Sequence, residues 1–260
     1  MKSPGWRNAL VFAVALSGIA AAALLEPIAQ DLTYHRFADT RPLAGMPNFA
    51  NVVSNLPFLL IGVWGLAITG RLGSKHPLRL SWRIFFAGLC ATAAGSAWYH
   101  VAPDNPSLTW DRLPMTIAFM SFFAIVIGEY VSLTAARRLL VPLLAAGSAS
   151  VLYWAHTEAG GAGDLRPYAI VQFLPMLLIP LVVLLNRDRS DLGSAIGWMI
   201  VFYAAAKLGE FFDAPILAFT GFVSGHTLKH LLAAIATLFL LLWLRRKTTV
   251  TSGDAGLLHG

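Results

Sequence analysis

The chain has 260 residues, of which 57% are hydrophobic and 12% are charged, and its mean hydropathy is +0.66. A typical soluble domain carries roughly twice this share of charged residues, so the composition excludes an ordinary soluble fold. The formal net charge is +6, and the single cysteine, Cys90, excludes both a disulfide framework and a cysteine-based zinc site.

Apolar runs long enough to cross a bilayer recur from one end of the chain to the other. About 20 apolar residues are needed for one crossing, so the sequence predicts an all-α polytopic membrane protein. We expect a bundle of seven transmembrane helices preceded by one extra N-terminal helix. The predicted spans are residues 8–28, 49–69, 82–101, 113–134, 138–156, 168–186, 193–212 and 226–244.

The first run has two interpretations. Lys2 and Arg7 precede an Ala-rich apolar stretch, which is also the pattern of a cleavable signal peptide. No convincing processing site follows, so we expect a retained transmembrane helix within residues 1–30. Residues 31–247 then form the seven-helix domain, and residues 248–260 form a flexible cytoplasmic tail.

Basic residues alternate between the segments that connect the spans. Of the 19 Lys and Arg, thirteen fall on the side that carries both termini, four fall on the other side and two lie inside spans. Positive residues are enriched on the cytoplasmic side, so we expect both termini in the cytoplasm of a bacterial plasma membrane. Because the basic residues follow this orientation, no nucleic-acid partner is expected.

Three of the seven histidines, near the ends of predicted spans, are candidate metal ligands, whereas His156 at the end of the fifth span needs no such role. His226 and His230 are about one helical turn apart, so both imidazoles project from one face and can reach one metal ion. His100 ends the third span, and the predicted topology places all three at non-cytoplasmic helix ends. Three neutral histidines with an open fourth position are the ligand set of a catalytic zinc ion. The alternative is three unrelated histidines near the membrane surface.

Two further polar residues share this depth. Asp111 opens the fourth span, and Ser96 lies one turn before His100 on the same helix face. Thr227 follows His226 where a zinc protease of the HExxH type has its glutamate, which argues against peptide hydrolysis by that arrangement.

Four segments, in this order, resemble the alkaline ceramidase family, which belongs to a wider group of seven-helix membrane hydrolases that includes the adiponectin receptors. The segments are Asn51–Asn55, Ser96–His100, Trp110–Asp111 and His226–His230. The resemblance implies a seven-helix bundle with a lipid-accessible cavity and hydrolysis of the amide bond in ceramide-like lipids. It also implies a zinc ion held by His100, His226 and His230, with Ser96 and Asp111 beside it.

On this hypothesis the protein's partners are its two substrates, a membrane lipid and water. The hypothesis also gives Asp111 and Ser96 their roles. Asp111 orients a zinc-activated water, accepts its proton and returns it to the departing amine. Ser96 donates a hydrogen bond to the developing oxyanion. The family's acidic calcium-binding stretch is not matched, because Asn48 stands where a glutamate aligns. This difference argues against a bound calcium ion.

A second polar set lies in the seventh span. Lys207, Glu210 and Asp213 are three residues apart, which predicts one face of a helix. We expect an internal ion pair that joins helices; the alternative is head-group binding or support for the metal ligands. Asn51 and Glu129 are expected to make hydrogen bonds between helices, and Asn51 is also a candidate to support the metal site.

Two other classes of function fit parts of the sequence. A haem-binding protein would use His100 and a second histidine as axial ligands, but needs neither Ser96 nor Asp111. A transporter would suit Lys207 and Glu210 in an intramembrane proton relay. The presence of both Ser96 and Asp111 favours the hydrolase.

Overall fold

The computed structural model describes residues 5–256, with side chains through residue 249, and this part of the chain is all-α as predicted. Seven helical spans in it are long and apolar enough to cross a membrane, and an eighth is present if a bent helix pair is one span. The helices are α1 (Gly5–Ala23), η1 (Leu32–His35), α2 (Phe49–Val53), α3 (Leu56–Arg71), α4 (Arg79–Val101), α5 (Asn105–Tyr130), α6 (Leu133–Ala159), α7 (Arg166–Leu185), α8 (Gly193–Phe211), α9 (Asp213–Thr220) and α10 (Gly225–Gly256).

The predicted span 49–69 is broken into α2 and α3, and the cause is local. Pro57 has no N–H to donate to the preceding turn, and the helix restarts just before it. The backbone N–H of Asn55 bonds to the carbonyl of Val52 at 3.3 Å. The carbonyl oxygen of Asn51 accepts hydrogen bonds from Ser54 Oγ at 3.0 Å and Asn55 Nδ2 at 2.9 Å instead. The break therefore turns polar side chains into the bundle without leaving that backbone group unpaired.

Helix ends differ from the predicted spans by several residues, as at α5, which begins at Asn105, and two of the differences change the ends of the bundle. The axes of α8 and α9 meet at 83°, and Pro215 in the first turn of α9 removes the hydrogen bond that would continue α8. At the other end, α10 continues to Gly256, so the first part of the tail predicted as flexible is helical. The hydroxyls of Thr248 and Thr249 bond to carbonyls one turn back, and no proline interrupts the helix there.

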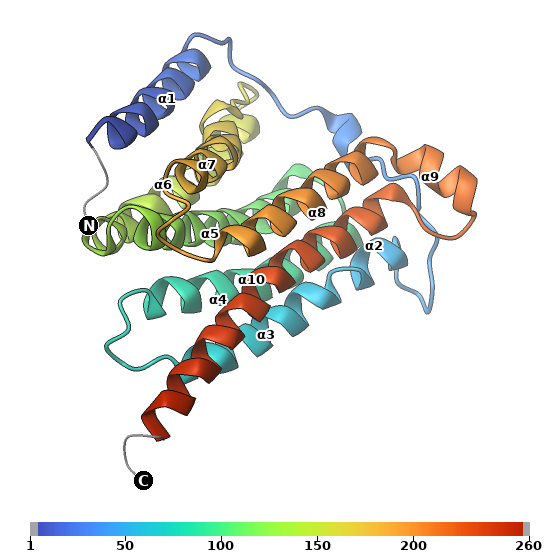
Figure 1. Cartoon of the computed structure of the whole chain (residues 1–260). Coiled ribbons are helices and arrows are strands. Elements are labelled where there is room, and N and C mark those ends of the chain that lie inside the picture. Colours follow the sequence, from blue (N-terminus) through green and yellow to red (C-terminus); the bar gives the residue numbers. More distant parts are fainter. Residues whose placement is uncertain (1–4, 257–260) are drawn as a thin grey trace.

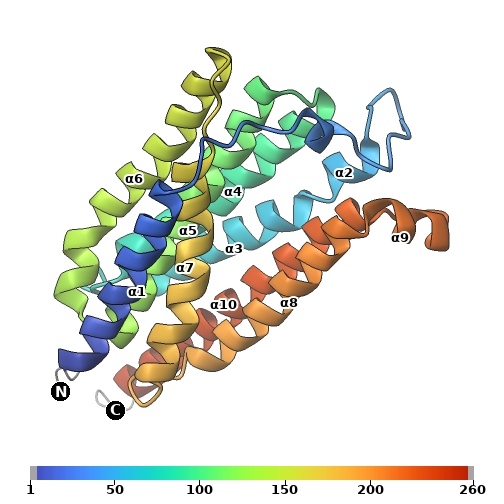
Figure 2. The ribbon, with the colours of Figure 1, turned by 90° about the horizontal axis from the view of Figure 1, so that it is seen from above.

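The helices pack as a bundle around α4 and α5 (Figure 1). In this bundle α10 lies between α8 and α3, while α5 also contacts α6 and α7. The extra helix α1 lies at the outside against α7 and buries none of its residues. Figures 1 and 2 both show α1 beginning and α10 ending at one end of the bundle, with α2 and α9 at the opposite end.

Candidate metal centre

Helices α4 and α10 bring three imidazoles together at the end of the bundle that holds α2 and α9. His100 ends α4, and His226 and His230 occupy the first turns of α10. Their exposed fractions are 1%, 5% and 5%, so each ring is buried. One ring nitrogen of each lies within 4.8 Å of the others, in a cluster that could hold a metal ion. The sequence-based prediction of this trio as a metal-ligating group is confirmed to that extent.

The spacing of the ring nitrogens fits a tetrahedral metal. His100 Nε2 lies 3.3 Å from His230 Nε2 and 3.3 Å from His226 Nε2. Nitrogen ligands about 2.0–2.1 Å from a tetrahedral zinc ion are themselves about 3.3–3.4 Å apart. Two of the three nitrogen–nitrogen separations therefore match the spacing that such an ion requires, and the third is within 4.8 Å.

The hydrogen bonds of Ser54 favour one tautomer of His230. Ser54 Oγ lies 2.7 Å from His230 Nδ1 and donates its single proton to the carbonyl of Asn51. A hydroxyl that donates to this carbonyl is an acceptor for Nδ1–H, an arrangement that puts the lone pair of neutral His230 on Nε2. This is the tautomer that a metal ligand needs, and it is held by a hydrogen bond of the kind found behind ligating histidines.

Asp213 orients the start of α10. Its Oδ1 accepts from the backbone N–H of His226 at 2.7 Å, and its Oδ2 accepts from the N–H of Ala38 at 2.9 Å. Gly225 is required beside it, because a Cβ at that position would overlap the carbonyl oxygen of Gly209 in α8. Asp213 thus lies beyond the bend after α8 and supports a histidine backbone, rather than continuing the predicted helix face.

The segment before α2 covers two of the imidazoles. The ring of Phe37 lies 4.6 Å from that of His100 and 4.5 Å from that of His226, between centroids. Asn48 Nδ2 donates to the carbonyl of His100 at 2.9 Å. Asn51 connects the same segment to α10, because its amide donates to the Asp39 carbonyl at 3.2 Å and accepts from Thr227 at 2.8 Å. Its predicted role as an interhelical hydrogen-bonding group is confirmed.

A cavity of about 410 Å³ adjoins the metal centre, and His230, Ser96 and Asp111 all line it. The two polar residues meet because α4 and α5 approach closely at Gly95, where a Cβ would overlap the carbonyl oxygen of Trp110. The volume lies in the range of small-molecule binding pockets. The open side of the metal centre is therefore the side of Ser96 and Asp111.

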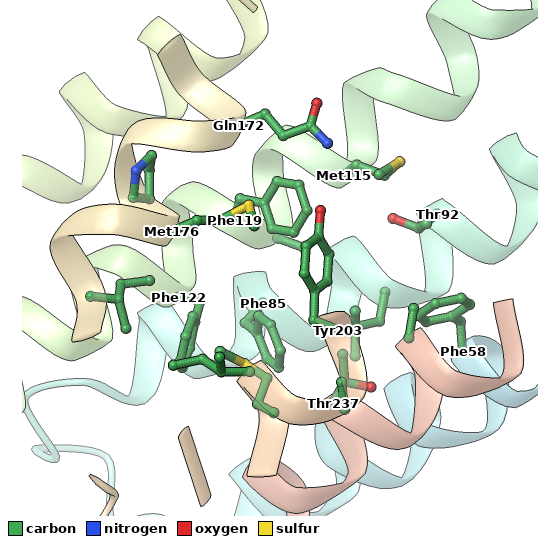
Figure 3. A pocket seen from close by; sticks show the side chains of 18 of the residues that line it. Phe58, Phe85, Thr92, Met115, Phe119, Phe122, Gln172, Met176, Tyr203 and Thr237 are labelled. Atoms are coloured by element: carbon green, nitrogen blue, oxygen red, sulfur yellow. The ribbon is translucent and has the colours of Figure 1, made fainter. Parts of the chain in front are cut away.

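A second cavity, of about 190 Å³, continues from the first into the bundle and is almost entirely apolar. Figure 3 shows Phe85, Phe119 and Phe122 around it, with Gln172 and the Tyr203 hydroxyl toward one end. The two cavities have six lining residues in common: Phe58, Thr92, Met115, Gln172, Tyr203 and Ala233. Together they form an elongated space with a polar and an apolar end.

Two members of the second polar set, Lys207 and Glu210, form the expected ion pair, and Lys229 from outside the set joins Glu210 to α10. Glu210 in α8 pairs with Lys207 in the same helix and with Lys229 of α10 at 3.0 Å. Glu129 accepts a hydrogen bond from Ser190 at 2.9 Å, which ties α5 to the loop before α8. Lys207, Glu210 and Lys229 also line the polar cavity, so the pairs stand at its edge.

Two residues of the site were not singled out by sequence reasoning. Phe37 lies in a segment without helical periodicity, and no pattern distinguishes it. Arg112 counted only as a basic residue of a loop, although it follows Asp111 directly and is buried in α5. A charged residue inside an apolar helix was the available signal.

Comparison with protein-family models and with curated protein sequences finds no match to this chain.

Proposed function

We propose that this protein is a zinc-dependent membrane hydrolase that cleaves the amide bond of ceramide-like lipids, as the resemblance to the alkaline ceramidases implies. One observation carries the proposal. Three convergent histidine nitrogens, one of them with a favoured tautomer, face a cavity that also contains Ser96 and Asp111 and that continues into an apolar pocket.

The side chains divide the chemistry between them. His100, His226 and His230 would hold the zinc ion, which when bound supplies a Lewis acid and lowers the pKa of a bound water. Asp111 holds the proton that leaves the attacking water and delivers it to the departing amine. Ser96 Oγ donates a hydrogen bond to the carbonyl oxygen as negative charge develops on it.

The cavities match the two parts of such a substrate. The apolar cavity, lined by Phe85, Leu89 and Phe122, accepts an acyl chain, because burying each CH₂ group contributes about 0.8 kcal/mol. The polar cavity accepts the amide and the water. On this proposal the junction of chain and amide lies at their shared residues, Met115 and Tyr203 among them, in the cavity that Asp111 lines.

The arrangement also supports the proposed orientation in a bacterial plasma membrane. The beginning of α1 and the end of α10 lie at the end of the bundle opposite the start of α10, which carries His226 and His230 (Figure 2). With both termini in the cytoplasm, the metal centre lies near the non-cytoplasmic surface.

The three-histidine geometry favours this function over haem binding. Axial haem ligands lie on opposite faces of a flat macrocycle, whereas the nitrogens of His100, His226 and His230 converge on one point. The candidate relay residues Lys207 and Glu210 are paired with each other, which leaves the transport hypothesis without a supporting contact of its own.

The test compares metal content with turnover in detergent-purified protein. We expect about one zinc per chain in the wild type and in Asp111→Asn, and little in His230→Ala; plasma mass spectrometry measures this. His156→Ala, at an exposed position near the end of α6, is the matched control and should keep its zinc.

Hydrolysis of a ceramide is then followed by release of the fatty acid. We expect turnover in the wild type and in His156→Ala only. Full activity of Asp111→Asn would show that the role given to this carboxylate is wrong. A wild-type protein prepared without chelators that contained no zinc would refute the metal centre, and iron with a haem absorption band would replace it by the haem interpretation.

A further inference from the structure

We propose that the lipid amide carries an anionic group close to its amide nitrogen and that Arg112 binds this group. The inference rests on the proposed function and specifies its substrate class as N-acyl amines with a carboxylate, phosphate or sulfonate on the amine side. Ceramide itself, which is neutral, would be a weaker ligand.

Arg112 is held within an aromatic enclosure beside the catalytic aspartate. Its guanidinium carbon lies 4.3 Å from the ring centroid of Trp154, 4.8 Å from that of Tyr168 and 5.6 Å from that of Tyr34. The residue is 6% exposed and lines the same cavity as Asp111 and His230. These rings hold the cation in place by cation–π attraction but supply no negative charge.

The hydrogen-bonding capacity of this guanidinium is largely unused. A guanidinium has five N–H donors, and Nη2 of Arg112 donates to Gln30 Oε1 at 2.7 Å. Nη1 is buried without a hydrogen-bond partner, and no carboxylate among the described residues forms an ion pair with Arg112. A buried cation without a counter-ion is costly, so an anion that enters the cavity is favoured there.

The charges around the cavity point the same way. Three carboxylates and three basic side chains line it, namely Asp31, Asp111, Glu210, Arg112, Lys207 and Lys229. These six charges balance, so a divalent metal at the histidines leaves the region with a surplus of two positive charges. Within the low dielectric of a membrane protein, that surplus attracts an anionic ligand.

The order of residues along α5 gives the position of the anion. Asp111 and Arg112 lie at the polar end, Met115 lines both cavities, and Phe119 and Phe122 line only the apolar one. An acyl chain among the phenylalanines puts the amide near Asp111. On the proposal, the anionic group then lies in the polar cavity a few bonds from the amide nitrogen, within reach of the Arg112 guanidinium that lines this cavity.

A purely structural role for Arg112 accounts for only part of these contacts. The bond to Gln30 fastens the segment after α1 to α5, and loss of Arg112 would loosen it. That role does not need an unpaired Nη1 or a position on the cavity wall. The experiment must therefore separate recognition of the anion from the structural effect of the hydrogen bond between Arg112 and Gln30.

The test measures binding of lipid amides with one chain length and different amine parts to full-length, zinc-loaded protein in detergent. The probes are N-dodecanoylglycine, N-dodecanoylethanolamine phosphate and neutral N-dodecanoylethanolamine. We expect both anionic probes to bind the wild type about tenfold or more tightly than the neutral one, the effect of one charge-assisted hydrogen bond. Dodecanoate is included and should compete less well than N-dodecanoylglycine.

Four variants identify the group that recognises the anion. Arg112→Gln should lose the preference, and so should Gln30→Glu, which keeps the fastening contact but supplies an internal counter-ion 2.7 Å from Nη2. Gln30→Ala removes only the hydrogen bond between Gln30 and Arg112 and should retain the preference for anionic probes. His230→Ala should retain a preference that is smaller than that of the wild type, because the charge of the metal is lost but Arg112 remains.

Three outcomes would overturn the inference: no preference in the wild type, a preference that survives in both Arg112→Gln and Gln30→Glu, or dodecanoate binding as tightly as N-dodecanoylglycine. Loss of the preference in His230→Ala, with its retention in Arg112→Gln, would assign the anion to the metal instead. Because all of these are binding measurements, they hold or fail separately from hydrolysis, whose absence would refute the proposed function alone.

Discussion

Replacing Ser54 by alanine tests whether the hydrogen bond behind His230 prepares the metal centre. The hydroxyl lies 2.7 Å from His230 Nδ1 in a site where Ser54 is 4% exposed and His230 is 5% exposed. Without it, the Nδ1–H of the ligand tautomer has no acceptor from Ser54, and the ring is free to adopt the other tautomer.

The expected size of the effect follows from two known costs. A buried donor left without a partner costs about 1–3 kcal/mol. Loss of a group that orients a ligating histidine weakens metal affinity about 10–100-fold, which corresponds to about 1.4–2.8 kcal/mol. The two ranges agree, so we expect zinc affinity of Ser54→Ala to fall by one to two orders of magnitude.

Competition with a chromophoric chelator in detergent measures this affinity. Ser150→Ala is the matched control, because Ser150 is equally buried and donates to a backbone carbonyl at 2.7 Å, but in α6 and away from the imidazoles. Its zinc affinity should equal that of the wild type. Equal affinities for wild type, Ser54→Ala and Ser150→Ala would refute the tautomer argument.

Three further predictions concern packing and charge. Gly95→Ala should separate α4 from α5, which should lower the free energy of unfolding by about 1–3 kcal/mol and remove most of the activity. Gly197→Ala, with open space around its Cβ, should change neither the stability nor the activity. The hydrogen bond from Arg166 lowers the pKa of Asp164 to about 2 from its ordinary 3.8, so the carboxylate stabilises the fold above about pH 4 and less as the pH falls toward 2. The difference in unfolding temperature between wild type and Asp164→Asn should therefore shrink between about pH 4 and pH 2, and a constant difference would contradict this. Glu210→Gln should lower the unfolding temperature by removing the ion pairs between α8 and α10, with a smaller effect at high salt, and a salt-independent loss would point to packing instead.

The membrane spans and the histidine cluster were predictable from the sequence because both depend on regular spacing. Hydropathy fixes the length of a span, and the turn between His226 and His230 places both rings on one face. His100 was grouped with them because the predicted topology places it at the same membrane depth, and the structure brings all three rings together at one end of the bundle.

Features that depend on interruptions of helices were not predictable in this way. The break after α2 turns Ser54 toward His230, and the bend before α9 lets Asp213 reach the backbone of α10. Prolines also lie inside the unbroken helices α5 and α6, so a proline alone does not reveal where a helix stops.

Arg112 shows a second limit. Its partners Gln30, Trp154 and Tyr168 come from three distant parts of the chain, and only the assembled bundle brings them around one guanidinium. A count of basic residues by loop registers its charge but not its surroundings.

The cover that Phe37 forms over the imidazoles has a consequence for how the ion arrives and leaves. This ring belongs to an extended segment rather than to a helix, and it lies against His100 and His226 while His230 lines the cavity. If the site holds zinc as proposed, we expect the helices to determine how tightly the ion is held and the opening of the segment to determine how fast it exchanges. Phe37→Ala should accelerate zinc release in a stopped-flow chelator chase far more than it changes the equilibrium affinity. The lifetime of the loaded protein and its metal affinity would then be separate properties of two different parts of the chain.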